Sequence, residues 1–212
     1  MPSTTARMPR RDAADNRLAL LDAARVMLND DPESSLEAIA TRAGLSRRSV
    51  YGHFANRDEL LRELVTTGSA RIAGALEGVT HPDPVLRLAL IASRLWQEVE
   101  DIRMMAVLAV RGPLKMHTAS ALRPLRMSVL GAIVEGQASG RIRTDIAAPR
   151  LAHLVEDSAL AVLEESSEHP MTASEGHTLA ILVVLGAIGF GWREANEFMA
   201  SHAELNQKVT RS

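Results

Sequence analysis

Apolar residues recur at three- and four-residue spacing along almost the whole chain, and no stretch alternates polar and apolar residues for long. That period is typical of amphipathic helices, whereas half-buried strands need alternation. The pattern therefore predicts an all-α protein. The first helix is expected at 13–28, with one stripe formed by Leu18, Leu21, Ala24, Arg25 and Leu28.

Capping signals then predict three further helices close together. Ser34 with Glu37 forms a capping box for the second helix, and Ser46 can cap the third. Asn56 with Glu59 forms another capping box for the fourth. Short helices at such close spacing indicate a small helical domain at the N-terminal end.

The fourth helix is expected to continue to about residue 79, where the proline-containing stretch 80–84 breaks it. We predict a basic, disordered arm at 1–12, a three-helix helix-turn-helix domain at 13–58 and a larger helical domain at 59–205. In that larger domain, helices are expected near 84–100, 102–110, 118–139, 148–166 and 173–202.

Composition narrows the class of protein. The chain has 212 residues, 46% of them hydrophobic, which is enough for a sizeable core. Because there is no cysteine, disulfides, thiolate nucleophiles and cysteine-ligated zinc are excluded. The segment 1–17 lacks the apolar run of a secretory signal, and the longest apolar run, 179–192, is too short to cross a bilayer. We expect a cytoplasmic protein that does not insert into a membrane.

The net charge of −2 does not suggest a nucleic-acid binder, but its distribution does. The stretch from Ser46 to Arg57 contains three arginines, Arg47, Arg48 and Arg57, and no acidic residue. A locally positive surface on a nearly neutral chain suits a compact DNA-binding domain.

The segment 36–55 reads LEAIATRAGLSRRSVYGHFA and has the steric pattern of two crossing helices. Ala40 is small enough for a close crossing, and Gly44 can adopt the left-handed conformation expected just past the first helix. Leu45 and Val50 are expected to turn inward. The segment therefore predicts a helix-turn-helix whose second helix enters the major groove of DNA.

On that second helix, Arg47 and Arg48 are candidates for base readout, because a guanidinium can pair with guanine through two hydrogen bonds. Tyr51 and His53 suit phosphate contacts, and Arg57 is a cation in the first turn of a helix, where a phosphate would stabilise it. The alternative is a solvated basic face on a small helical unit. The full candidate set for DNA binding is Ser35, Ser46, Arg47, Arg48, Ser49, Tyr51, His53 and Arg57.

At these residues the sequence resembles the TetR family of bacterial repressors. Tyr51-Gly52-His53-Phe54 matches the Tyr-x-x-Phe that ends the family's recognition helix, and Arg57-Asp58-Glu59-Leu60-Leu61 matches the start of its fourth helix. The likeness covers about 13–65. It implies a homodimer on a palindromic operator in double-stranded DNA, with phosphate contacts from Tyr51, His53 and Arg57. Gly52 departs from the larger residue usual in the family, and Arg57 from the usual lysine.

The family resemblance also implies that the last two long helices pair across a twofold axis. The stretch 179–192 is apolar on every face, which suits such a helix, although a central helix of a monomer would look the same. The residues expected at this interface are Leu151, Val155, Leu182, Leu185, Gly186, Gly189 and Trp192.

A pocket for a small, mostly apolar effector is expected among the central helices, because methionines suit adaptable apolar cavities. Residues of this kind are also common in ordinary cores. The candidates are Trp96, Met104, Met105, Met116, His117 and Met127. A ligand that tilts the fourth helix would separate the recognition helices and release DNA.

Two other classes remain open. His153 and Asp157 lie four residues apart, and His117 and His177 could join them at a metal, which would suit an enzyme. No catalytic motif accompanies them, so we expect neither catalysis, nor a metal, nor a cofactor. A helical adaptor that binds proteins through its apolar faces is the other alternative.

Overall fold

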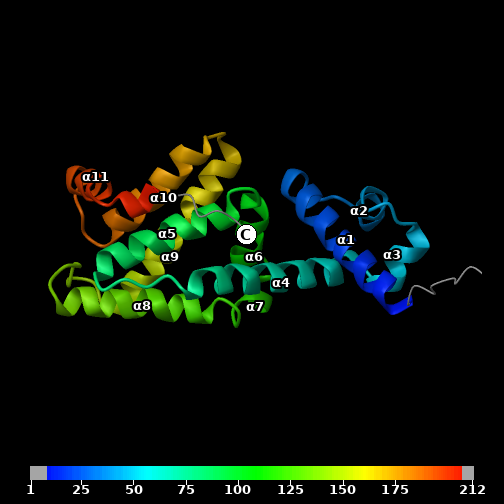
Figure 1. Cartoon of the computed structure of the whole chain (residues 1–212), viewed down its shortest axis with the longest axis horizontal. Coiled ribbons are helices and arrows are strands. Elements are labelled where there is room, and N and C mark those ends of the chain that lie inside the picture. Colours follow the sequence, from blue (N-terminus) through cyan, green and yellow to red (C-terminus); the bar gives the residue numbers. More distant parts are fainter. Residues whose placement is uncertain (1–8, 207–212) are drawn as a thin grey trace, which may run out of the picture.

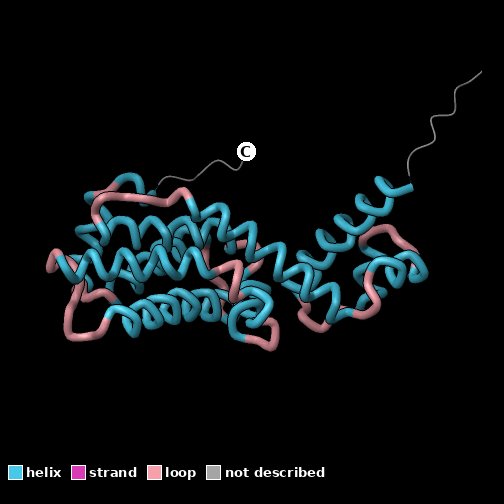
Figure 2. The backbone as a smooth tube through the Cα atoms, turned by 90° about the horizontal axis from the view of Figure 1, so that it is seen from below, coloured by secondary structure: helices cyan, strands magenta, loops and turns pink. Residues whose placement is uncertain are grey.

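The computed structural model describes residues 9–206, and all regular structure within that range is helical (Figures 1 and 2). The all-α class predicted from the sequence is confirmed. The elements are α1 (Pro9–Asp30), α2 (Leu36–Arg42), α3 (Arg47–His53), α4 (Arg57–Glu77), α5 (Pro84–Val99), α6 (Arg103–Arg111), α7 (Lys115–Thr118), α8 (Arg123–Ala138), α9 (Ala148–Glu168), α10 (Ala173–Ala187), α11 (Trp192–Ser201) and a 3-10 helix (Ala203–Asn206).

The chain forms a small N-terminal group of helices and a larger C-terminal bundle, joined by α4 (Figure 1). One apolar core holds α1, α2 and α3 together and takes in Leu60 and Val65 of α4 as well as Met105 of α6. The N-terminal core thus extends past residue 58, where we expected its domain to end. Two further apolar cores fill the bundle, the larger built mainly from α5, α8, α9 and α10.

Capping chemistry places several helix starts. Asp83 accepts hydrogen bonds from the backbone N–H groups of Val85 and Leu86, with Pro84 at the first helical position of α5. Thr172 and Glu175 form a capping box at the start of α10. Polar residues at these two positions therefore set where α5 and α10 begin.

The expected cap of α2 was wrong by one residue. Ser35, not Ser34, is the N-cap, and its hydroxyl accepts a hydrogen bond from the backbone N–H of Ala38 at 3.2 Å. Ser34 is buried and donates instead to a carboxylate oxygen of Asp31 at 3.3 Å. Asn56 caps α4 as predicted, but the carboxylate of Glu59 accepts from the N–H of residue 55 rather than from Asn56.

Helix boundaries differ from the expectation at three places. α1 begins at Pro9, so residues 9–12 are helical and only 1–8 of the expected arm lie outside the described residues. The helix expected at 118–139 is divided into α7 and α8. The helix expected at 173–202 ends at Ala187, because the chain turns at Gly189 with a φ of +115° before α11 begins.

The stripe predicted for α1 was wrong at two positions, because Leu18 and Arg25 are both exposed. Leu18 is 61% exposed, whereas Leu20 is fully buried with Ala24 and Leu28. Apolar residues at 18, 20 and 21 allow either register, and the packing of α1 on α2 and α4 selects the one through Leu20.

No helix within residues 9–206 is long and apolar enough to span a membrane.

Candidate functional site

The helix-turn-helix consists of α2 and α3 with a tight turn between them. Gly44 lies in that turn with a φ of +71°, the left-handed conformation predicted for it. Ser46 caps α3 as predicted, with its hydroxyl accepting from the backbone N–H of Ser49 at 3.2 Å. The turn and the cap together fix the angle between the two helices.

The inward face of this unit packs as the sequence predicted. Ala40 is 1% exposed at the crossing of α2 with α3, and Val50 is fully buried. Phe54, which directly follows α3, is also fully buried and belongs to the same core as Leu20 and Ile39. α3 is therefore held on α1 and α2 by its apolar side.

The opposite face of α3 is open to solvent. Arg47 and Arg48 are exposed, as is Ser46 at the start of the helix, and Tyr51 is 44% exposed. Ser49 and His53 are partly exposed. The structure therefore brings most of the predicted DNA-binding residues to one accessible face, together with the exposed Ser35 that caps α2.

A carboxylate that the sequence analysis missed lies on this face. Glu37 Oε1 accepts a hydrogen bond from the Tyr51 hydroxyl at 2.7 Å and lies 3.5 Å from Nη2 of Arg47. The Arg47 guanidinium also lies over the Tyr51 ring, 5.8 Å from its centroid. The hydrogen bond raises the pKa of Tyr51 and lowers the pKa of Glu37.

Arg57 does not point freely toward solvent. Its Nε donates to the carbonyl oxygen of Ser34 at 3.0 Å, and its Nη2 donates to the carbonyl oxygen of Pro32. These carbonyls stabilise the cation at the first turn of α4, so no phosphate is needed to explain its position. In this structure, which holds no DNA, Arg57 ties the start of α4 to the loop before α2, and its expected phosphate contact stays a prediction.

Arg17, which the sequence did not single out, joins three elements. Arg17 of α1 forms an ion pair with Glu63 of α4 and donates to the carbonyl oxygen of His53 at 2.6 Å. Its guanidinium also lies 4.3 Å from the ring centroid of Phe54. Because its partners are 36 and 46 residues away, only the tertiary structure reveals this role.

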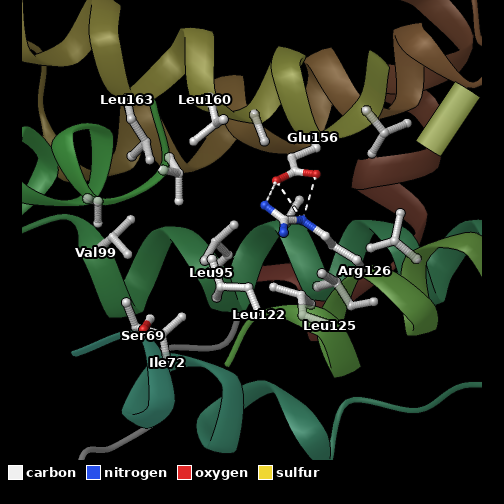
Figure 3. A pocket seen from close by; sticks show the side chains of 18 of the residues that line it. Ser69, Ile72, Leu95, Val99, Leu122, Leu125, Arg126, Glu156, Leu160 and Leu163 are labelled. Atoms are coloured by element: carbon white, nitrogen blue, oxygen red, sulfur yellow. Dashed lines mark hydrogen bonds and ion pairs between the residues drawn. The ribbon is translucent and has the colours of Figure 1, made fainter. Parts of the chain in front are cut away.

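A cavity of about 380 Å³ lies inside the larger domain (Figure 3). Its walls come mainly from α4, α5, α6, α8 and α9, and they consist largely of leucine, isoleucine, valine, alanine and methionine side chains. Its volume falls in the range of small-molecule pockets, which is roughly 300–1,000 Å³. Ile72 and Leu95 lie on one side of it, and Leu160 and Leu163 on another (Figure 3).

One ion pair projects into this apolar space. Arg126 of α8 points at Glu156 of α9 (Figure 3), with its Nε 3.0 Å and its Nη2 2.6 Å from Oε1. Arg71, also in the lining, pairs with Glu98 at 2.6 Å. The hydroxyl of Ser69 donates to the carbonyl of residue 66 within its own helix. The polar groups of the cavity are thus mostly satisfied within the protein.

Of the expected pocket residues, the structure places Met105 and Met127 in the lining of this cavity. The other four, Trp96, Met104, Met116 and His117, do not line it. Trp96 is 2% exposed and packs against Gly176, and its ring N–H donates to the carbonyl of residue 173. Met116 is 85% exposed and His117 is exposed, because α7 projects them away from the bundle. Met104 is only partly buried and follows Arg103 at the start of α6.

The expected interface residues divide into two groups. Leu151 and Leu185 are fully buried and Val155 is 5% exposed, so these side chains belong to the core of the chain itself and do not form an outer face. Leu182 is partly exposed, and Gly186, Gly189 and Trp192 are exposed. The periodicity of an all-apolar helix does not distinguish its inner from its outer side.

The metal cluster considered for an enzyme does not assemble. Within the described part of the chain, no group of three or more histidine, aspartate or glutamate side chains is placed to hold a metal ion. His177 packs between α10 and α5, where its Nε2 lies 2.7 Å from the hydroxyl of Ser93. His117 lies on the exposed α7.

Comparison with known proteins agrees with this architecture. Residues 20–64 match the family model described as bacterial regulatory proteins, tetR family. No curated protein sequence matches the chain significantly.

Solved structures share the fold over most of their length. The regulator FadR of Bacillus subtilis, in complex with stearoyl-CoA, is 17% identical with a TM-score of 0.65, over 80% of this chain and 98% of that one. SmeT, the repressor of a Stenotrophomonas maltophilia multidrug efflux pump, is 24% identical with a TM-score of 0.61, over 81% and 89%. LfrR of Mycobacterium smegmatis, in complex with proflavine, is 17% identical with a TM-score of 0.65, over 86% and 99%. Residues 20–64 therefore resemble the N-terminal domain of the tetR family of bacterial regulatory proteins, and most of the chain shares the fold of these solved regulators.

Proposed function

We propose that this protein is a repressor that binds a palindromic operator as a homodimer and leaves it when a small, mostly apolar ligand occupies the cavity. The observation that carries the proposal is α3 itself. Val50 anchors it by its inner side, while Arg47 and Arg48 stand exposed on its outer side. A docked helix with an exposed basic face is what major-groove binding requires.

On DNA, Arg47 and Arg48 read bases, and Tyr51 and His53 contact phosphates. Ser35, Ser46 and Ser49 lie at the helix N-termini, where backbone N–H groups and hydroxyls attract phosphate oxygens. Arg57 acts through the loop that precedes Ser35, which it holds by two backbone carbonyls. Arg57→Ala is therefore expected to weaken binding evenly across sequences, by loosening that loop.

The second subunit packs on the outer side of α9 and α10. Leu182 of α10 is partly exposed and Gly186 is exposed, and on α9 Leu154 is 43% exposed. Trp192, 71% exposed at the start of α11, and Gly189 extend this surface. A twofold pairing of such a surface gives the two recognition helices the spacing that a palindrome needs.

Release from DNA follows from the position of the cavity. α4 supplies Leu64, Val65 and Ile72 to its lining, and the same helix supplies Leu60 to the core of the DNA-binding domain. A ligand that shifts α4 thus changes the separation of the recognition helices. Ligand-bound relatives of the same fold, FadR with stearoyl-CoA and LfrR with proflavine, support an effector role for the cavity. As a regulator it would act in the cytoplasm, without catalysis or a cofactor.

Selection of bound duplexes from a random pool tests the DNA part of the proposal. We expect a palindrome, bound by a dimer with an affinity that falls steeply as salt rises. Replacing Arg47 and Arg48 together by alanine is expected to relax base preference, whereas Tyr51→Phe weakens binding evenly. Arg123→Ala, an exposed change at the start of α8 and outside both proposed interfaces, is the matched control. A pool without enrichment, or binding only by monomers, would contradict the proposal.

A further inference from the structure

We propose that the cavity takes an aliphatic monoanion, a flexible alkyl chain with one acidic head, and that Arg25 of α1 binds the head. This inference rests on the proposed effector function of the cavity and names the chemical class of its ligand. It follows from three observations: the chemistry of the walls, the pairing of their charges and the place of Arg25.

The walls suit an alkyl chain rather than a planar ring. Among the described residues that line the cavity, none is phenylalanine, tyrosine or tryptophan. Flat aromatic ligands and organic cations gain much of their affinity by stacking on such rings, which are missing here. The lining instead consists mostly of aliphatic side chains, such as Leu64, Ile91 and Val184. Burial of methylene groups against these walls is favourable, because it removes apolar surface from water.

Two of the three arginines in the lining have a carboxylate partner within the protein. Arg126 pairs with Glu156, and Arg71 pairs with Glu98, whose other oxygen pairs with Arg94 outside the lining. Arg25 lines the same cavity, is exposed, and forms no hydrogen bond or ion pair with any described residue. A ligand with one negative charge therefore complements the cavity, because the guanidinium supplies donors for a carboxylate.

A cationic head finds no equivalent partner. Glu156 is the only acidic residue in the described lining, and both of its oxygens already accept hydrogen bonds from Arg126. A cation would have to break this pair and leave Arg126 without its counterion at an apolar wall. The cavity therefore favours an anion over a cation for two reasons: Arg25 is available to an anion, and Glu156 is already occupied by Arg126.

The place of Arg25 links the head group to the DNA-binding domain. Arg25 belongs to α1, which packs against α4 and α6, and these two helices supply Gly68 and Met105 to the same lining. Met105 is also part of the N-terminal core. A ligand with its tail among α5, α8 and α9 and its head on Arg25 therefore spans both domains, so its binding is sensitive to their relative position.

Calorimetric titration of the full chain with decanoate, decanol and decylammonium, each below its micellar concentration, tests the assignment. We expect decanoate to bind about fivefold more tightly than decanol, since an exposed ion pair is worth up to about 1 kcal/mol. Decylammonium is expected to bind more weakly than decanol. The planar acid 1-naphthoate is expected to bind more weakly than decanoate.

The variant Arg25→Gln is expected to abolish the preference for decanoate over decanol and to leave decanol binding unchanged. Arg25→Lys, which keeps the charge, is expected to keep most of the preference. Arg42→Gln removes another exposed arginine of the same domain, outside the lining, and is expected to change nothing. Equal binding of decanoate and decanol to the wild type, or an unchanged preference in Arg25→Gln, would overturn the assignment.

The effector function itself fails in a different way. If decanol and decanoate both release operator DNA with equal strength, the cavity senses aliphatic ligands but the role of Arg25 is wrong. If neither probe binds the wild type while operator DNA is still bound, both the ligand class and the effector role of the cavity are wrong. The cavity-filling variant Ala159→Phe is expected to lose binding of both probes, and unchanged binding there would show that the probes bind outside the cavity.

Discussion

The hydroxyl of Tyr51 donates a hydrogen bond to Glu37 across 2.7 Å, joining the recognition helix α3 to the first turn of α2. The same carboxylate lies 3.5 Å from the guanidinium of Arg47. In the absence of DNA, one anion therefore engages two of the groups that we assign to DNA. On binding, phosphates and base edges compete with Glu37 for these groups.

Glu37→Gln is expected to strengthen DNA binding a few-fold and evenly across sequences. The amide still accepts a hydrogen bond from Tyr51, but the negative charge beside the phosphates is removed. Fluorescence anisotropy at several salt concentrations, with specific and random duplexes, measures this. Weaker binding confined to the operator would mean instead that the carboxylate is needed to position Arg47.

The same variant is expected to change the titration of Tyr51. The hydrogen bond to Glu37 raises the pKa of Tyr51 above its ordinary value, so Glu37→Gln lowers that pKa. Tyr51 is the only tyrosine of the chain, which makes its ultraviolet titration specific. An unchanged tyrosine pKa in the variant would show that the hydrogen bond does not persist in solution.

Arg17→Ala is expected to lower the free energy of unfolding by roughly 1–2 kcal/mol, because it removes hydrogen bonds to Glu63 and to the carbonyl of His53 and a cation–π contact with Phe54. Urea denaturation measures the change. Arg62→Ala, on the exposed side of α4, is the control and is expected to stay within about 0.5 kcal/mol of the wild type. Equal losses in the two variants would contradict a joining role for Arg17.

Two glycine-to-alanine changes are expected to have opposite effects on stability. A Cβ at Gly52 in α3 meets no atom within 4 Å, so Gly52→Ala gains up to about 1 kcal/mol from helix propensity. A Cβ at Gly176 in α10 would lie 1.9 Å from the ring of Trp96, so Gly176→Ala is expected to cost about 1–3 kcal/mol. Thermal unfolding without DNA compares the pair, and a stabilised Gly176→Ala would show that Trp96 packs elsewhere.

Acidification is expected to destabilise the larger domain in part through His177. Burial lowers the pKa of His177 below its ordinary value, with Glu100 opposing the shift. A histidine with a depressed folded-state pKa contributes stability above its unfolded pKa, and that contribution is lost as the pH falls through the folded value. His177→Gln should therefore lose less melting temperature than the wild type between about pH 7.5 and about pH 5.5. An equal fall in melting temperature in both proteins would show that His177 does not contribute to the acid destabilisation.

The helix-turn-helix could be predicted from the sequence because its determinants are local. Ala40, Gly44 and Val50 act on neighbours a few residues away, through the close crossing of two helices, a left-handed turn and an inward side chain. The three-to-four-residue period likewise determined the helical class, since the spacing of apolar side chains is a property of each helix alone.

Only the tertiary structure decided which of several equivalent apolar or basic residues does what. Periodicity marks a face of a helix but not the element that covers it. For example, Trp96 packs in the core against Gly176, which is eighty residues away in the sequence, whereas Met105 lines the cavity. The Arg57 guanidinium donates a hydrogen bond to a backbone carbonyl instead of extending into solvent. Arg25, exposed on α1, became part of the cavity because α4 and α6 fold beside it. Such partners are distant in sequence, so their identity depends on how whole helices pack.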